Sequence, residues 1–293
     1  MTAALALRPR QLHPATPPAY VNRTESIAAL AARSLELEVR TWPKPGLVSP
    51  LDAGSHTDMD IGTFRRSAAA IQPYFHALAD AGAQGCAMGR LRLIGLEAEA
   101  AMLAATGGVN THRGAIFGLG LLCAAAGARA PGRADSAMPL GAVVACRWKD
   151  DILAGPTLLH SHGGAALRRY GAGGARLEAA RGFPSLYEVG LPALREGALM
   201  AAGDAEAARV QACFALIAAV ADTNLLHRGG LAGLRFAQRA ARVFLEEGGV
   251  GRRDWRQRAL AVHRAFVARR LSPGGSADLL AMSLFVQACE AEG

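Results

Sequence analysis

Apolar residues recur at intervals of three and four positions along nearly every long segment of this 293-residue chain. This spacing places the apolar side chains on one face of an α-helix, whose period is about 3.6 residues. Alanine and leucine are abundant, whereas aromatic residues make up only 5% of the chain and valine and isoleucine are sparse. Because this composition favours helices over sheets, the chain is predicted to adopt an all-α fold.

The periodicity also sets the expected boundaries. Helices are predicted over residues 24–40, 62–81, 90–105, 114–127, 150–169, 185–200, 205–224, 229–246, 253–271 and 276–291. Residues 138–148 are the best candidate for a strand, but they lack partner strands and are predicted to be helical. The connectors are short, so residues 23–293 are expected to form a single domain. Residues 1–22, a short apolar run and a Pro-rich segment, are expected to be a disordered leader.

The formal net charge is +8, which by itself suits nucleic acid, anionic lipid or a polyphosphate ligand. Most of the excess is arginine spread along predicted helices, as at Arg235, Arg239 and Arg242, and no dense basic block is interleaved with aromatic residues. This distribution indicates solvated helix faces, and no nucleic-acid partner is expected. No apolar stretch approaches about 18 uninterrupted residues, so no membrane partner is expected either.

Five cysteines are scattered without a C-x-x-C pair, namely Cys86, Cys123, Cys146, Cys213 and Cys289. They are expected to be small core residues with free thiols, and neither disulfides nor zinc ligands. Free thiols are typical of a reducing compartment, so the cytoplasm is the expected location.

Polar residues gather in Gly- or Pro-containing segments that begin or end predicted helices: 38–60, 107–114, 160–184, 222–230 and 272–278. Loops on a rigid scaffold commonly carry binding and catalytic residues. In the first segment, Pro43 and Pro45 restrict the backbone around Lys44, which would hold one positive charge in place for a phosphate. A rigid turn with a solvated lysine is the alternative.

Acidic residues at helix starts leave two interpretations open. Asp58 and Asp60 follow His56, and carboxylates two positions apart in a loop can both reach one hard cation such as Mg²⁺. Helix N-caps use the same residue types, so Asp60 can equally be a cap. Asp278, near the start of the last predicted helix, offers the same choice between cap and ligand.

The segment 107–114 places polar residues directly before a long apolar helix. Asn110 or Thr111 can cap this helix, and His112 and Arg113 stand at its start. A helix N-terminus supplies free N–H groups and a partial positive charge, so the segment suits an anionic phosphate. An ordinary cap with a surface histidine and arginine is the alternative.

Two further segments combine glycines or helix ends with charged groups. The glycine-rich run 171–174 can bring backbone amides close to a phosphate, while Arg176 adds a bidentate donor and Glu178 a carboxylate. Asp222, at the end of an apolar run and near Asn224, is a candidate metal ligand or acid/base group. Neither a Walker A loop nor a dinucleotide fingerprint occurs in the chain.

Taken together, the segments resemble the triphosphoribosyl-dephospho-CoA synthase family, which makes the prosthetic-group precursor for citrate lyase and malonate decarboxylase. The matching motifs follow the family's order: PKPGLV at 43–48, GSHTDMD at 54–60, GVNTHRGAIF at 108–117, GARLEAARGFP at 174–184, DTNLLHRGG at 222–230 and SPGGSADLLA at 272–281. The family more often has Lys where Arg113 stands, which keeps the charge. The family more often has Thr-His-Gly-Glu where this chain has Ser-His-Gly-Gly at 161–164. Because this chain lacks the glutamate of that loop, Glu178 is the favoured catalytic carboxylate.

The resemblance implies an all-α catalytic domain that transfers the 5-triphosphoribosyl group of ATP to the 2′-hydroxyl of 3′-dephospho-CoA and releases adenine. Breaking an N-glycosidic bond builds positive charge on the ribose, so carboxylates, a proton donor and a base are expected nearby. The implied cofactor is Mg²⁺. A separate transferase is expected to attach the product to the carrier protein of malonate decarboxylase or citrate lyase, and the oligomeric state stays open.

The resemblance also distributes roles among the candidate residues. Glu178, Asp58 and Asp222 are the expected catalytic carboxylates, with Glu178 favoured as the acid/base. Asp58, Asp60, Asp222 and Asp278 are the expected Mg²⁺ ligands. The expected substrate-binding residues are Lys44, His56, Asn110, Thr111, His112, Arg113, Arg176 and Asn224. A Mg²⁺-dependent N-ribosyl hydrolase and a noncatalytic nucleotide- or CoA-binding protein are the alternatives.

Overall fold

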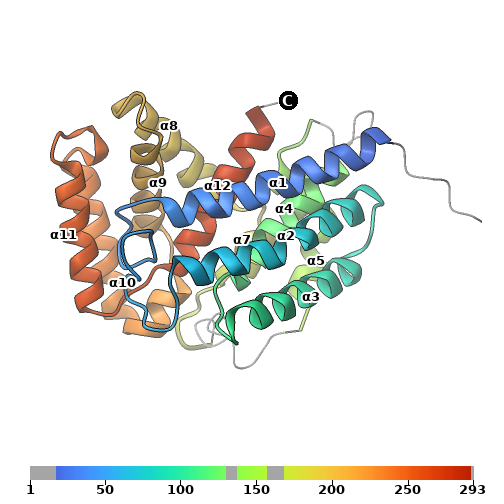
Figure 1. Cartoon of the computed structure of the whole chain (residues 1–293), viewed down its shortest axis with the longest axis horizontal. Helices are drawn as coiled ribbons and strands as arrows, with labels where there is room; N and C mark the ends of the chain where they lie inside the picture. The colour runs from blue at the N-terminus through green and yellow to red at the C-terminus, as the bar shows by residue number, and fades with distance from the viewer. Residues whose placement is uncertain (1–17, 130–136, 157–167, 292–293) are drawn as a thin grey trace, which may run out of the picture.

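The computed structural model describes residues 18–129, 137–156 and 168–291, and these residues form an all-α fold without strands, as predicted (Figure 1). The elements are α1 (Pro18–Arg40), α2 (Ile61–Ala83), α3 (Met88–Thr106), α4 (Arg113–Ala128), α5 (Leu140–Ala154), α7 (Gly174–Ala180), the π-helical turn η1 (Leu186–Gly190), α8 (Leu191–Met200), α9 (Ala205–Ala219), α10 (Thr223–Glu246), the 3₁₀ turn η2 (Gly249–Gly251), α11 (Trp255–Ala268) and α12 (Gly274–Ala291).

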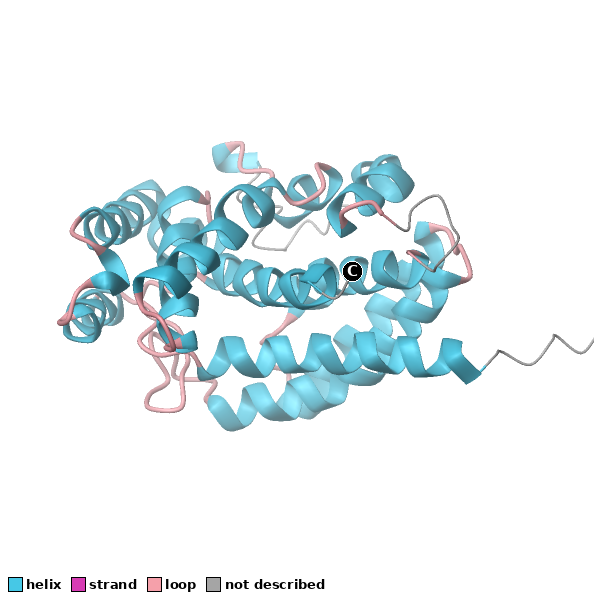
Figure 2. Cartoon of the chain, turned by 90° about the horizontal axis from the view of Figure 1, so that it is seen from above, coloured by secondary structure: helices cyan, strands magenta, loops and turns pink. Residues whose placement is uncertain are grey.

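The last helix, α12, runs through the middle of the molecule (Figures 1 and 2). It packs against α1 and α4 on one side and against α9 and η1 on the other. One continuous cluster of buried apolar side chains joins both sides, from Ile27 in α1 to Val286 in α12. The start of α12 therefore lies where the N-terminal and C-terminal halves of the chain meet.

Helix existence was predicted better than helix ends. The segment 138–148 is helical, as predicted, but residues 150–154 continue the same helix instead of starting a new one. Most of the remaining stretch predicted to be helical up to residue 169 lies outside the described residues. α7 was missed, because its seven residues follow glycines that indicated a loop. α1 begins at Pro18, inside the predicted leader; residues 1–17 lie outside the description.

The boundary between α9 and α10 also differs from the prediction. α9 ends at Ala219, and α10 begins at Thr223 instead of residue 229. A break at Gly230, with φ of 59°, divides α10 and explains why the periodicity suggested a later start. None of the described helices alone is long and apolar enough to span a bilayer. Only α9 and α10 together pass that test, and they are bent by 60°.

The contact between α2 and α4 depends on glycine. A Cβ atom on Gly82 of α2 would overlap the backbone carbonyl of Ala124 in α4, and one on Gly127 of α4 would overlap the carbonyl of Ala79 in α2. Backbone atoms cannot rotate away as a side chain can. The two helices therefore approach more closely than any larger residue at these positions permits, and this fixes where α4 begins relative to α2.

We expect Gly82→Ala to lower the free energy of unfolding by about 1–3 kcal/mol, because the added methyl group overpacks the α2–α4 contact. Gly95→Ala in α3 is the matched control, since nothing lies within 4 Å of the new methyl group. That variant should gain up to about 1 kcal/mol from helix propensity. Urea unfolding monitored by circular dichroism measures both changes, and a stable Gly82→Ala protein would contradict the close approach.

Candidate active site

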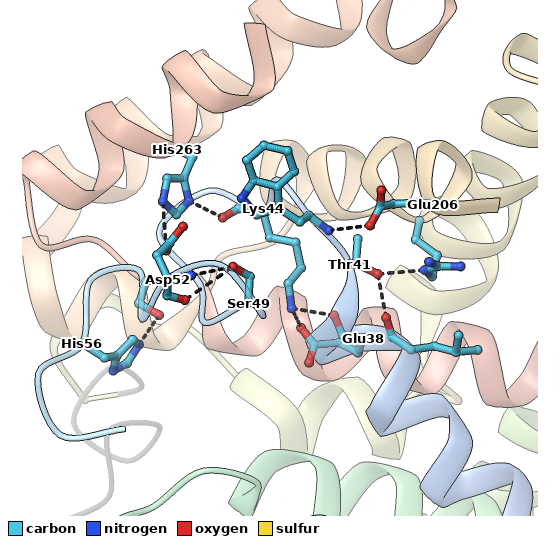
Figure 3. Close-up of polar contacts among 12 residues, drawn as sticks. Glu38, Thr41, Lys44, Ser49, Asp52, His56, Glu206 and His263 are labelled. Atoms are coloured by element: carbon cyan, nitrogen blue, oxygen red, sulfur yellow. Dashed lines mark hydrogen bonds and ion pairs between the residues drawn. The ribbon is translucent and has the colours of Figure 1, made fainter. Parts of the chain in front are cut away.

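The loop after α1 buries its lysine. Lys44 is 1% exposed, and its Nζ donates a hydrogen bond to the backbone oxygen of Glu38 at 2.6 Å. The same ammonium forms an ion pair with the Glu38 carboxylate (Figure 3). Burial raises the pKa of Glu38 more than the neighbouring ammonium lowers it. The alternative interpretation, in which Lys44 is solvated, is therefore wrong. The positive charge of Lys44 is paired with the carboxylate of Glu38, a residue of α1.

The same loop is fastened to α11. Nδ1 of His263 lies 2.8 Å from the backbone oxygen of Lys44, and its Nε2 lies 3.2 Å from Asp52 Oδ1 (Figure 3). Farther along the loop, Ser55 Oγ donates to the backbone oxygen of Leu271 at 2.6 Å. These contacts join residues about two hundred positions apart and hold Lys44 from the side opposite Glu38.

Asp278 interacts electrostatically with two other carboxyl groups, those of Glu38 and Asp222. Asp222 is 1% exposed, and Asp278 near the start of α12 is partly buried. Burial raises the pKa of both aspartates, and Glu38 and Asp222 raise that of Asp278 further. Like charges in a poorly hydrated site cannot all be ionised at once without large cost. Glu38, Asp222, Asp278 and Lys44 are called here the charge cluster, and the pKa of each of its three carboxyl groups is raised, chiefly by burial.

Asp222 joins the starts of two helices. Its Oδ1 caps α10 by accepting hydrogen bonds from the backbone N–H groups of Asn224 at 2.9 Å and Leu225 at 3.3 Å. Its Oδ2 accepts from the backbone N–H of Ser276 at 2.8 Å and from its hydroxyl at 3.0 Å. Both oxygens are thus occupied within the protein. Asp222 is therefore the N-cap of α10, and it also brings α12 against α10.

The start of α4 faces Asp278. Asn110 caps this helix, because its Oδ1 accepts the Arg113 N–H at 3.2 Å. Asp278 accepts a hydrogen bond from the backbone N–H of Ala115. A Cβ atom on Gly114 would overlap the Asp278 carboxylate, so only glycine permits this approach. The helix N-terminus predicted for an anion is therefore occupied in part by a carboxyl group of α12.

His112 is a buried, neutral histidine. It is 3% exposed, and its Nδ1 lies 2.6 Å from the hydroxyl of Ser67 in α2. Burial, and then the charge of Lys44, lower the pKa of His112 to about 4. Thr111 does not cap α4; its hydroxyl donates to Ser67 at 2.7 Å. The electrostatic coupling to Lys44 links His112 to the charge cluster.

A second group of polar residues lies beside the turn that precedes α12. His56 Nε2 lies 2.9 Å from Ser272 Oγ, and Arg228 donates to His56 Nδ1 at 3.1 Å. Asp58 is exposed, with Oδ1 3.6 Å from His56 Nδ1. Burial and the positive charge of Arg228 lower the pKa of His56. Because Ser272 and Asp278 belong to one turn and helix start, this group adjoins the charge cluster.

Other predicted residues have structural partners elsewhere. Arg176 donates hydrogen bonds to the backbone oxygens of Ile152 at 2.6 Å and of Leu153 and Gly155 at 2.8 Å, at the end of α5. Glu178 accepts from the Ser185 N–H at 2.6 Å and from its hydroxyl at 3.0 Å. Burial raises the pKa of Glu178, but its charged neighbours are Glu188 and Arg181, outside the charge cluster.

Two more residues complete the comparison with the predicted site. Arg113 forms an ion pair with Glu99 of α3 at 2.9 Å and keeps a partly exposed side chain. Asp60 caps α2 through hydrogen bonds of 2.8 Å from the Thr63 N–H and hydroxyl, and these lower the pKa of Asp60. The glycine-rich stretch before α7 follows residues 157–167, so the first part of the predicted segment 160–184 lies outside the described residues.

The comparison with known proteins decides the family. Residues 24–293 match the family model described as ATP:dephospho-CoA triphosphoribosyl transferase. A protein of Stutzerimonas stutzeri named "Probable 2-(5''-triphosphoribosyl)-3'-dephosphocoenzyme-A synthase" is 43% identical over 271 residues, 89% of this chain and 91% of its own length. The chain belongs to the ATP:dephospho-CoA triphosphoribosyl transferase family. It is therefore a transferase, as the motif resemblance implied.

A second relative supports the assignment to this transferase family. The Pectobacterium atrosepticum protein named "2-(5''-triphosphoribosyl)-3'-dephosphocoenzyme-A synthase" is 42% identical over 265 residues, which is 86% of this chain and 85% of its own length. No solved structure matches the chain. The geometry described above is accordingly the available view of how this transferase arranges its motifs.

The predicted magnesium ligands do not form one metal cage. Within 18–129, 137–156 and 168–291, no group of three or more His, Cys, Asp or Glu side chains is arranged to hold a metal ion. Asp60 and Asp222 are used as helix caps, while Asp58 and Asp278 belong to different groups. Such an arrangement suits an ion that arrives on phosphates and takes one or two carboxylates, which is how proteins often bind Mg²⁺.

Sequence reasoning missed the partners that hold the predicted residues. Glu38 and Ser67 both lie on buried faces of helices, and Ser67 stands four positions before Ile71 on the apolar stripe of α2. A single polar residue on an apolar stripe is a sequence signal for such a partner, because a buried polar group requires a hydrogen-bond or charge partner. Arg228 lay within a quoted motif but received no role.

We expect Lys44→Met to lower the free energy of unfolding by about 3–5 kcal/mol near neutral pH, because Glu38 would remain buried without its counter-ion. The double variant Glu38→Leu/Lys44→Met should recover most of this loss, since no charge is left unpaired. Urea unfolding of both proteins measures the difference. Equal losses in the single and double variants would contradict a buried pair.

The loss in Lys44→Met should depend on pH. Burial raises the folded-state pKa of Glu38 and Lys44 lowers it, so removal of Lys44 raises this pKa further above the unfolded value than in the unmodified protein. Stability contributed by the proton on Glu38 is present below the unfolded pKa and is lost as pH rises through the folded pKa. Urea unfolding at about pH 5 and about pH 8 should therefore show the larger deficit, relative to the unmodified protein, at the higher pH.

Proposed function

We propose that the protein transfers the 5-triphosphoribosyl group of ATP to the 2′-hydroxyl of 3′-dephospho-CoA and releases adenine. The observation that carries this proposal is the charge cluster at the start of α4, assembled from three of the motifs shared with the family. The relatives named above support the substrate pair, because two of them carry the name of this synthase at 42% and 43% identity.

The reaction requires two proton movements and stabilisation of a positive sugar. Adenine leaves the ribose as the glycosidic bond breaks, and its nitrogen must be protonated. The attacking 2′-hydroxyl must lose a proton as its oxygen bonds to the ribose carbon. A group of carboxyl groups with raised pKa values can hold both protonated and ionised members, and its negative charge favours an oxocarbenium-like transition state.

Asp278 is the best placed acid/base residue. Asp222 already accepts four hydrogen bonds through its two oxygens, and Glu38 is paired with Lys44. Asp278 is partly exposed, and its raised pKa lets it carry a proton. We therefore move the acid/base role from Glu178, which is bound to Ser185, to Asp278, and keep Asp222 as the residue that aligns α10 with α12.

The triphosphate is proposed to lie across the first turn of α4, where the helix dipole, Arg113 and His112 favour an anion. His56 and Arg228 lie beside the neighbouring turn and would contact the more distant phosphates or the acceptor. Mg²⁺ would be held by substrate phosphates and by Asp58 or Asp278, and it would supply charge neutralisation. A contact between Arg176 and a phosphate stays a prediction. It would require Arg176 to give up its hydrogen bonds to the backbone oxygens at the end of α5.

The destination of the product is a further part of the proposal. We propose that a separate transferase attaches it to the carrier protein of malonate decarboxylase, with citrate lyase as the alternative. The cytoplasm is the proposed location, because all five cysteines are free thiols, as predicted, and free thiols suit a reducing compartment. Incubating purified product with each apo carrier protein and its transferase distinguishes the two destinations.

The purified protein should release adenine from ATP with Mg²⁺ only when 3′-dephospho-CoA is present. The CoA product should gain the mass of one triphosphoribosyl group, measured by mass spectrometry. Adenine released equally without the acceptor would show an N-ribosyl hydrolase instead. Binding of both nucleotides without any adenine would show a noncatalytic binding protein.

Asp278→Asn should lower kcat by about 10²–10⁴-fold, because the amide can neither give nor accept the proton. The free energy of unfolding of this variant should not fall, because the substitution removes the repulsion between Asp278 and the carboxyl groups of Glu38 and Asp222. Glu178→Gln tests the competing assignment, and Asp254→Asn, in an exposed ion pair with Arg252, is the control. A larger kcat loss in Glu178→Gln than in Asp278→Asn would return the acid/base role to Glu178.

A further inference from the structure

His112 is held by the protein through only one of its two ring nitrogens. Nδ1 contacts Ser67, whereas Nε2 has no hydrogen-bond partner among the described residues. Among the described residues, two side-chain nitrogen atoms are buried without a hydrogen-bond partner, and no side-chain oxygen atom is. These two atoms are Trp42 Nε1 and Arg258 Nε. Nε2 of His112 is not one of these two atoms, so this edge of the buried ring is the one at which a ligand atom could approach.

Two hydroxyl groups determine which nitrogen carries the proton. Thr111 Oγ1 donates to Ser67 Oγ at 2.7 Å, and Ser67 Oγ lies 2.6 Å from His112 Nδ1. A hydroxyl group has one proton to donate. Ser67 is fully buried and its hydroxyl has no other acceptor among the described residues, so its own proton points to Nδ1, which then acts as the acceptor. In a neutral imidazole the remaining proton is then on Nε2.

The surroundings keep the ring neutral and fixed in orientation. Ser67 is fully buried, and the Phe64 ring packs edge-on against His112 with centroids 5.0 Å apart. The positive charge of Lys44 disfavours protonation of the His112 ring. His112 is also the residue that precedes the first turn of α4, next to Arg113. A neutral N–H group at this place suits an anionic oxygen without requiring protonation.

We propose that Thr111 and Ser67 are positioning residues that hold His112 as its Nε2–H tautomer, and that this N–H donates a hydrogen bond to a phosphate oxygen of bound ATP. The inference rests on the proposed function for the identity of the ligand. The tautomer itself is a property of the protein without substrate. The two parts can therefore be tested separately.

The tautomer is read from the ring ¹⁵N shifts of protein labelled at its eight histidines. The His112 signals are identified by their loss in His112→Gln. The unmodified protein should show protonated Nε2 and unprotonated Nδ1. Thr111→Val, which keeps the shape but removes the hydroxyl, should give a mixture of tautomers, and Thr111→Ser should restore the single form. A proton on Nδ1 in the unmodified protein, or no change in Thr111→Val, would overturn the relay.

The ligand contact is read from ATP affinity, measured by titration calorimetry with Mg²⁺, so that it does not depend on turnover. Thr111→Val and Ser67→Ala should weaken ATP binding about tenfold, the usual effect of a hydrogen bond to a charged group. Thr111→Ser should restore the affinity. Ser34→Ala, which deletes a buried hydroxyl bonded only to the Leu30 carbonyl, is the matched control.

The outcomes separate this inference from the proposed function. An altered tautomer with unchanged ATP affinity would overturn the role of His112 toward phosphate. The expected tautomer and affinity changes without adenine release, in the assay with 3′-dephospho-CoA, would support the relay and overturn the synthase proposal. Equal losses of ATP affinity in Ser67→Ala and Ser34→Ala would show a general loss of packing and would also overturn the relay.

Discussion

The buried ion pair between Lys44 and Glu38 is the contact on which the arrangement of the candidate site depends. A single charge transferred from water to a protein interior costs several kcal/mol, so neither side chain could be buried in ionised form without the other. The pair fixes the loop after α1 against the end of α1, while His263 holds the same loop from α11. Burial lowers the pKa of His112, and the charge of Lys44 lowers it further. The pairing in one loop thus contributes to keeping neutral the residue that precedes α4.

Periodicity was sufficient to predict the helices because each one buries an apolar stripe in a common core, as α2 and α4 do. It did not predict the ends, because these depend on capping contacts between distant segments. Asp222, for example, caps the start of α10 and also accepts a hydrogen bond from Ser276, which lies more than fifty positions later in the chain. Gly230 interrupts α10 through a backbone conformation with positive φ, which is why the periodicity placed the start of this helix too late.

The motifs indicated the correct family, but the roles of single positions in them were ambiguous. Asp60, Asp222 and Glu178 each accept backbone N–H groups, and a carboxylate that caps a helix looks the same in sequence as one that binds a metal. Arg176 likewise binds carbonyl groups at the end of α5 instead of facing an anion. Only the distant partners, such as Glu38 for Lys44, distinguish these uses, and their pairing follows from the fold rather than from local spacing.

The balance of charge in the cluster bears on the proposed binding of Mg²⁺ with the nucleotide. One ammonium in the charge cluster faces three carboxyl groups, and the described residues provide no metal cage to neutralise the remainder. Proton sharing reduces that negative charge and also supplies the groups that glycosidic bond cleavage requires. A triphosphate brought to the same place adds several negative charges, which the first turn of α4 and Arg113 offset only in part. Mg²⁺ that travels with the nucleotide would complete the balance, so nucleotide and metal are expected to bind as one ligand.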